Sequence, residues 1–205
     1  SSPSAGSTFV APATIAINAT AADSDGTVSK VDFYQGTTLI GTDTTAPFSF
    51  NWTSVGAGGY SLTAKATDDR GGTTTSGAVA VTVNNPVPTV SISSPTPGTI
   101  FNAPATVAIS ASASVGVGTI SKVDFYQGTT LIGTATAAPF NFNWNNVGAG
   151  SYNLTATATA STGTVATSTA VAVTVNALPT VSIVAPTASS VFTAPGTIGM
   201  TASAA

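Results

Sequence analysis

The feature that most constrains this chain is an internal repeat. The segment SKVDFYQGTTLIGT at residues 29–42 recurs unchanged at 121–134, an offset of 92 residues. The same offset relates APFSFNW at 46–52 to APFNFNW at 138–144. A fixed period indicates that each repeat is one structural unit and that the chain is a tandem array of such units.

The alignment of the repeats also predicts where each unit begins and ends. The segment PTVSI at 88–92 recurs at 179–183, and the boundaries between units fall in two short linkers that contain proline, NNPVPT at 84–89 and NALPT at 176–180. Short proline-containing linkers favour semi-rigid spacing over free tumbling. Ser1 aligns with Ser93, so the first repeat has no counterpart of PTVSI. We therefore expect a first repeat at 1–84 that lacks its first strand, a complete second repeat at 85–176, and the opening strands of a third repeat at 177–205.

Apolar residues within a repeat recur with a period of two. Phe48, Phe50 and Trp52 alternate with polar residues, and Tyr60 and Leu62 begin another such series. This period predicts strands with one face on a core, and no segment has the period of a helix. Glycine, proline, aspartate and asparagine separate the series at intervals typical of a sandwich. The sequence therefore predicts an all-β fold of tandem immunoglobulin-like β-sandwiches, with about seven strands per 92-residue repeat.

Composition excludes several kinds of function. The chain contains no cysteine and no histidine, so the sandwiches are expected to have no disulfides. Thiol and imidazole catalysis and the usual zinc and copper ligands are excluded as well. The four cations form no basic stripe, so we expect no nucleic acid partner. No apolar run is long enough to cross a bilayer, so no membrane-spanning segment is predicted.

Several motifs together identify a family. The segment GGYSLTAKATD at 58–68 is typical of a penultimate strand that begins with a tyrosine corner, in which Tyr60 and its copy Tyr152 bond to the backbone. With PTVSI, FxAP, DSDGTVSKVDFYQGTTLIGT and APFxFNW, it resembles the bacterial Ig-like domain found in tandem in large secreted and surface proteins. Similar modules link parts of secreted cellulases and chitinases. The resemblance covers essentially the whole chain and implies a bacterial protein that is extracellular or at the cell surface.

A group of four aspartates is the strongest candidate site. In an immunoglobulin-like strand order, the loops DSDG and TDDRGG lie at the same pole of the sandwich. The second repeat replaces all four acids with uncharged residues. Carboxylates gathered on loops suit calcium, so we predict a metal site in the first repeat only; no cofactor is required otherwise. The alternative is that these acids cap turns, with Arg70 neutralising them. The predicted ligands are Asp23, Asp25, Asp68 and Asp69, and their replacements are Val115, Val117, Ala160 and Ser161.

Aromatic residues offer a second candidate site. Phe48, Phe50 and Trp52 point the same way along one strand, which favours a core over a sugar-binding platform. Tyr34 and its copy Tyr126 lie on the opposite face of their strand from the core residues and are the more credible exposed aromatics. Beside Tyr34 on that face, Lys30 and Asp32 are interpreted as a solvated cross-strand pair.

These observations favour a non-enzymatic extracellular structural protein that forms a rod, stalk or self-assembling filament at the bacterial surface. An adhesive or carbohydrate-binding module, with a surface polysaccharide as ligand, is one alternative. A spacer within a secreted polysaccharide hydrolase is the other.

Neighbouring copies of the same repeat or chain are the expected partners, through strand addition or end-to-end packing. The bare edge of the first repeat can be completed in cis by upstream residues or in trans by the tail of a neighbour. Because residues 185–205 duplicate the pattern of residues 1–21, the cis route is favoured.

Overall fold

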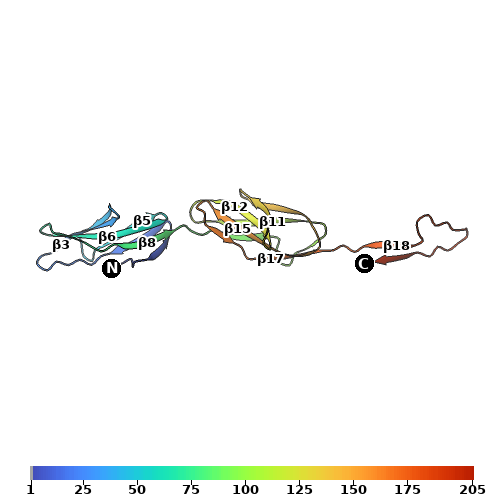
Figure 1. Ribbon diagram of the computed structural model, residues 1–205, viewed down its shortest axis with the longest axis horizontal. Coiled ribbons are helices and arrows are strands. Elements are labelled where there is room, and N and C mark those ends of the chain that lie inside the picture. Colours follow the sequence, from blue (N-terminus) through green and yellow to red (C-terminus); the bar gives the residue numbers. More distant parts are fainter. Residues whose placement is uncertain (1) are drawn as a thin grey trace. The chain divides into compact units, whose positions relative to one another are not determined.

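The computed structural model describes residues 2–205, and this part of the chain contains nineteen strands and no helix (Figure 1). The prediction of an all-β fold is therefore confirmed. Alternating apolar residues, rich in valine and threonine, suit the pleated and half-buried surface of such strands. Residues 2–205 contain no helix with the length and apolar character needed to cross a membrane.

The first repeat consists of two sheets. The larger has the order β1-β8-β6-β3-β4, with β7 paired to β6, and the smaller consists of β2 and β5. The pairs are antiparallel except that β1 runs parallel to β8. The strands are β1 (Ser7–Val10), β2 (Ala13–Asn18), β3 (Val28–Gln35), β4 (Thr38–Asp43), β5 (Ser49–Val55), β6 (Gly58–Asp68), β7 (Thr73–Thr75) and β8 (Val79–Asn84).

The second repeat repeats this arrangement and adds one strand. Its larger sheet has the order β10-β17-β15-β12-β13 with β16 paired to β15, and its smaller sheet has the order β14-β11-β9. The added strand β9 carries the PTVSI sequence. The strands are β9 (Thr89–Ser94), β10 (Ile100–Asn102), β11 (Ala105–Ser114), β12 (Ile120–Gln127), β13 (Thr130–Ala135), β14 (Phe140–Val147), β15 (Gly150–Ala160), β16 (Val165–Thr167) and β17 (Val171–Asn176).

The end of the chain forms a separate antiparallel pair, β18 (Val181–Ala185) with β19 (Thr201–Ala204). These strands match the first two long strands of the second repeat, β9 and β11. The apolar side chains of this tail are exposed: Val181 is 75% accessible and Ile183 is 69% accessible.

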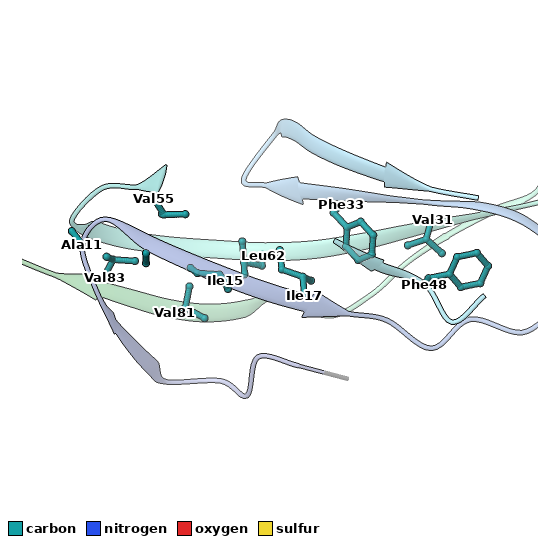
Figure 2. Close-up of a cluster of buried hydrophobic side chains, with 11 residues drawn as sticks. Ala11, Ile15, Ile17, Val31, Phe33, Phe48, Val55, Leu62, Val81 and Val83 are labelled. Atoms are coloured by element: carbon teal, nitrogen blue, oxygen red, sulfur yellow. The ribbon is translucent and has the colours of Figure 1, made fainter. Parts of the chain in front are cut away.

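The core of the first repeat lies between its two sheets. Figure 2 shows Ile15 and Ile17 of β2 beside Leu62 of β6, and Val31 and Phe33 of β3 beside Phe48. All of these side chains are buried, and Phe33 is fully inaccessible. Burying an aliphatic or aromatic side chain of this size contributes about 1.5–3 kcal/mol, so this alternating set is the main source of stability.

The aromatic series belongs to the core, as the sequence predicts, but its members are buried to different degrees. Phe48 is buried, whereas Phe50 and Trp52 are half-buried and pack against the core. The Phe50 ring stacks on Phe33 with centroids 6.0 Å apart, and Trp52 meets Tyr60 edge-on with centroids 5.0 Å apart. The same two pairs recur in the second repeat as Phe125–Phe142 and Trp144–Tyr152.

The tyrosine corner is confirmed in both repeats. The Tyr60 hydroxyl donates a 2.9 Å hydrogen bond to the carbonyl oxygen of Gly56, and Tyr152 donates a 3.0 Å hydrogen bond to Gly148. This bond fixes the turn before the longest strand of each repeat, β6 or β15.

Candidate functional site

The two acidic loops of the first repeat meet at one pole, as the sequence predicts. The backbone N–H of Asp69 donates a 2.9 Å hydrogen bond to the carbonyl oxygen of Thr27, and Val28 of β3 pairs with Asp68 of β6. Asp23 and Asp69 both lie over Gly26, where an added Cβ would stand 2.6 Å from Asp23 Oδ2 and 2.5 Å from Asp69 Oδ1. The loops therefore approach closely because residue 26 has no side chain.

Each carboxylate at this pole has a local hydrogen-bonding role. Asp68 Oδ1 accepts from the backbone N–H groups of Arg70 and Gly72, both at 2.8 Å. Asp25 forms an ion pair with the Arg70 guanidinium. Asp23 Oδ1 accepts from the N–H of Asp25 at 3.4 Å, and Asp69 Oδ2 lies 3.4 Å from the hydroxyl of Thr27. These contacts match the turn-capping interpretation, in which short acidic side chains satisfy nearby backbone donors.

The second repeat preserves the pole without its charges. The N–H of Ser161 donates to the carbonyl oxygen of Thr119 at 2.8 Å, and the Ser161 hydroxyl accepts from the N–H of Thr119 at 3.1 Å. This hydroxyl stands over Gly118, as the Asp69 carboxylate stands over Gly26. The carbonyl oxygen of the preceding Pro86 accepts a 2.8 Å hydrogen bond from the Thr164 hydroxyl, so linker backbone contacts this pole. The acids are therefore not needed to form it.

The fit of calcium to this pole can be judged from the arrangement of the carboxylates. Across residues 2–205, no three acidic side chains form a group that could hold a metal ion. Asp25 is engaged by Arg70, and Asp23 and Asp68 accept hydrogen bonds from backbone N–H groups. Asp23 and Asp68 also line one pocket with Val28 and Ala66. No three of the four carboxylates therefore converge, and calcium binding at this pole stays a prediction.

The pair formed by Lys30 and Asp32 differs from the sequence-based interpretation. Both residues lie on β3, so the pair runs along one strand rather than across two, and Asp32 is only 6% accessible rather than solvated. Lys30 Nζ lies 2.7 Å from Asp32 Oδ2, and the Thr42 hydroxyl of β4 donates to Oδ1 at 2.6 Å. Asp32 is buried because β3 is an inner strand, with β4 on one side and β6 on the other.

These contacts shift the titration of the pair. The hydrogen bond from Lys30, followed by that from Thr42, lowers the pKa of Asp32. The bond to Asp32 raises the pKa of Lys30. In the second repeat, burial would by itself raise the pKa of Asp124, but the hydrogen bonds from Lys122 and Thr134 outweigh it, so this pKa is also lowered. The recurrence of KVD in both repeats was the available sequence signal for this network.

The surface of the first repeat has a groove, named here the strand groove. One side of the groove is formed by β2 and the residues that follow β2, and the other side is formed by β6 and β8. The lining residues carry no charge: Ser2, Pro3, Ile17, Asn18, Ala19, Thr20, Ala21, Leu62, Thr63, Ala64, Ala66, Ser76, Gly77 and Val79.

Tyr34 and Tyr126 are half-buried. They lie beside the lysine–aspartate pairs, on the outer face of the larger sheet of each repeat. Only part of each ring is therefore accessible for stacking on a ligand.

Comparisons with known proteins agree with the geometry. A family model described as "Bacterial Ig domain" matches residues 1–83 and 88–156. Comparison with curated proteins found no match. Among solved structures, the fibronectin(III)-like modules of Clostridium thermocellum CbhA are 33% identical, with 86% of this chain and 92% of that chain covered, at a TM-score of 0.44.

Two further solved structures are more distant. The titin domains z1z2, solved in complex with telethonin, are 14% identical, with 86% of this chain and 94% of that chain covered, at a TM-score of 0.51. This likeness concerns the fold alone. SGBP-B from the mixed-linkage glucan utilization locus of Bacteroides ovatus, solved with a mixed-linkage heptasaccharide, is 17% identical, with 83% and 43% covered, at a TM-score of 0.31.

Proposed function

Because this chain belongs to the bacterial Ig domain family, we propose that it is a non-enzymatic structural spacer, a stretch of rod or stalk in an extracellular protein at the bacterial surface. Tandem modules joined by short proline-containing linkers hold a distance between whatever lies at their two ends. The function rests on the packing of each module rather than on a reactive group.

The observation that carries this proposal is what the two repeats have in common. Both repeats keep the stacked phenylalanines, the tyrosine corner and the lysine–aspartate–threonine network. The four pole acids and Asp43 occur in the first repeat alone. A binding or catalytic role would be expected to preserve the exposed groups, whereas a spacer needs only the features that hold each sandwich together.

The carboxylates support the non-enzymatic part of the proposal. Glycoside cleavage needs two carboxyl groups that face a substrate across a cleft, one of them with a raised pKa. Asp32 and Asp124 instead have lowered pKa values and are held by a lysine and a threonine. Asp43 accepts hydrogen bonds from the backbone N–H groups of Thr45 and Ser49, which also lower its pKa. The carboxylates of Asp32, Asp43 and Asp124 therefore serve to hold the fold through their hydrogen bonds.

The spacer proposal also covers the possibility that the module connects domains of a secreted polysaccharide hydrolase, because the physical role within this chain is the same. The competing proposal is an adhesive module that binds a surface polysaccharide through Tyr34 and Tyr126. It is less well supported, because both rings are half-buried.

The test is a direct assay of the rival functions with residues 1–205. Purified protein is incubated with a panel of insoluble and soluble polysaccharides, and both the bound fraction and the release of reducing sugar are measured. A spacer is expected to give no hydrolysis and no retention beyond that of an unrelated protein of similar charge. Retention that is lost in a Tyr34→Ala, Tyr126→Ala variant would establish the adhesive function instead.

A further inference from the structure

In each repeat, the first and the last strand of the larger sheet along the chain form a parallel pair. Strand β10 runs parallel to β17, with Ile100 opposite Thr174 and Asn102 opposite Asn176. Strand β1 runs parallel to β8 in the same way. The chain therefore enters this pair at the start of one strand and leaves it at the end of the other, and these two points lie at opposite ends of the pair.

The hydrogen bonds of the pair are reproduced between the repeats, although residues 4–11 and 96–103 differ at most of their aligned positions. The N–H of Gly98 donates to the carbonyl oxygen of Ala172 at 2.8 Å, and the N–H of Ala103 donates to that of Asn176 at 2.9 Å. The corresponding bonds of the first repeat are Gly6 to Ala80 at 2.8 Å and Ala11 to Asn84 at 2.9 Å.

A tight turn fixes the start of the first strand of the pair. The N–H and the hydroxyl of Thr99 both donate to the carbonyl oxygen of Thr96, at 3.2 and 2.7 Å. Gly98 has a φ of +82°, in the left-handed region that favours glycine. In the first repeat, Ser7 donates twice to Ser4 in the same manner, at 3.1 and 2.7 Å.

The partner strand β17 is held firmly in the module. It lies between β10 and β15, and its Val173 and Val175 are buried in the core. The N–H of Thr174 donates a 3.0 Å hydrogen bond back to the carbonyl oxygen of Thr99. A force on β10 is therefore passed through this set of backbone bonds to a strand that cannot move without opening the core.

Tension along the chain acts on this pair in shear. It pulls β10 toward its own start and β17 toward its own end, so the strands can part only by sliding, with all their bonds stretched together. Strands β15 and β17 behave differently, because Gly150 lies opposite Val175 in an antiparallel pair. Pulling the start of β15 away from the end of β17 opens those bonds one after another. Tension from the N-terminal side also passes through β9, which pairs with β11 in the smaller sheet.

We propose that the parallel pairs β10–β17 and β1–β8 are force-bearing clamps, which keep each module folded while the chain is under tension. The proposal rests on the spacer function, because tension between two attached parts passes through whatever holds them at a distance. Resistance to forced unfolding depends on the rate of unfolding rather than on the equilibrium stability of the core. The clamp is therefore a property separate from the packing that stabilises each sandwich.

The experiment pulls on the second repeat within residues 1–205 in two directions, by single-molecule force spectroscopy. The sequence contains no cysteine, so two introduced cysteines fix the points of attachment. Pro97→Cys with Ala177→Cys loads β10–β17 in shear, and Ala149→Cys with Ala177→Cys opens β15–β17 from one end; these positions are all exposed. At the same loading rate, the unfolding force is expected to be severalfold higher in the shear direction.

Two neighbouring substitutions test the bonds themselves. Ala103→Pro removes the N–H that bonds to Asn176. Asn102→Pro is the matched control, because alternate residues of a strand bond to the same parallel neighbour and the N–H of Asn102 points away from β17, at the edge of the sheet. Ala103→Pro is expected to lower the unfolding force in shear, and Asn102→Pro to leave it unchanged. Thermal melts show whether each variant folds.

Equal forces in the two directions would overturn the proposal, and so would a shear force on which the two proline variants have the same effect. If Ala103→Pro does not fold, the comparison of the two directions in the original sequence decides alone. The spacer function would fail on a different result, the retention or hydrolysis of a polysaccharide, so the two failures are distinguishable.

Discussion

Lys30 and Asp32 lie two residues apart on strand β3, and the lysine Nζ stands 2.7 Å from a carboxylate oxygen of the buried aspartate. The second repeat contains the same pair, Lys122 and Asp124, at 2.6 Å. These are the charged residues that both repeats have in common. Because a buried carboxylate without partners is costly, the lysine and the neighbouring threonine are what make this position tolerable.

The first prediction concerns pH. The pKa values of Asp32 and Asp124 are lowered in the folded state, so their stabilisation is present above the unfolded pKa of about 3.9 and is lost as pH falls through the folded values. The pKa values of Lys30 and Lys122 are raised in the folded state. Their contribution to stability is therefore complete below the unfolded pKa of about 10.4 and is lost as the pH rises through the folded values.

Thermal melts should therefore give a plateau in Tm between roughly pH 5 and pH 10, with losses on both sides. A double variant, Asp32→Asn with Asp124→Asn, should have a lower Tm on the plateau and should lose less Tm as the pH falls below about 5. A steep change in Tm between pH 6 and pH 8 would contradict this prediction, because none of these groups titrates there.

The second prediction ranks two aromatic residues of the second repeat. Phe125 is fully inaccessible, so Phe125→Ala should lower the free energy of unfolding by about 3–5 kcal/mol. Trp144 is half-buried against Tyr152, so Trp144→Ala should cost less, about 2–3 kcal/mol from lost burial and the lost aromatic pair. Urea unfolding followed by circular dichroism measures both. A Trp144→Ala chain with unchanged stability would place the tryptophan at the surface and revive the sugar-platform interpretation.

The third prediction concerns a glycine of the GTTLIGT segment. A Cβ added at Gly133 would overlap the ring of Phe142, which is itself stacked on Phe125. Gly133→Ala should therefore displace the stack and lower the free energy of unfolding by about 1–3 kcal/mol. Gly148→Ala is the matched control, because an added Cβ there meets nothing within 4 Å. Equal melting of the two variants would show that the stack does not depend on this close approach.

The fourth prediction is the effect of calcium. If the pole acids bind it, calcium should raise the Tm of the first repeat and leave that of the second repeat unchanged. The control chain carries the residues of the second repeat at the four acids: Asp23→Val, Asp25→Val, Asp68→Ala and Asp69→Ser. It should melt identically with and without calcium. Equal shifts in both repeats, or no shift in either, would leave turn capping as the explanation for these acids.

Much of this fold could be predicted from the sequence because the alternation of apolar residues is a local pattern and occurs in both repeats. The period of two in Phe48, Phe50 and Trp52 places all three on one face, and the 92-residue offset repeats that evidence. The immunoglobulin-like strand order places the two acidic loops at one pole, where the N–H of Asp69 bonds to the carbonyl oxygen of Thr27.

Other features could not be predicted, because they depend on neighbours that are distant in sequence. Alternation places Asp32 on the outer face of its strand, which suggests a solvated residue. Its burial follows from the pairing of β3 with both β4 and β6. Local sequence does not contain this pairing.

The most direct test of the spacer function is the length of chains with different numbers of modules. One, two and three extra copies of residues 85–176 are inserted in tandem, and the radius of gyration is measured by small-angle X-ray scattering. A spacer of semi-rigid modules predicts a nearly constant increment per added module. Growth close to the 0.38 power of residue number, as in a compact protein, would contradict it.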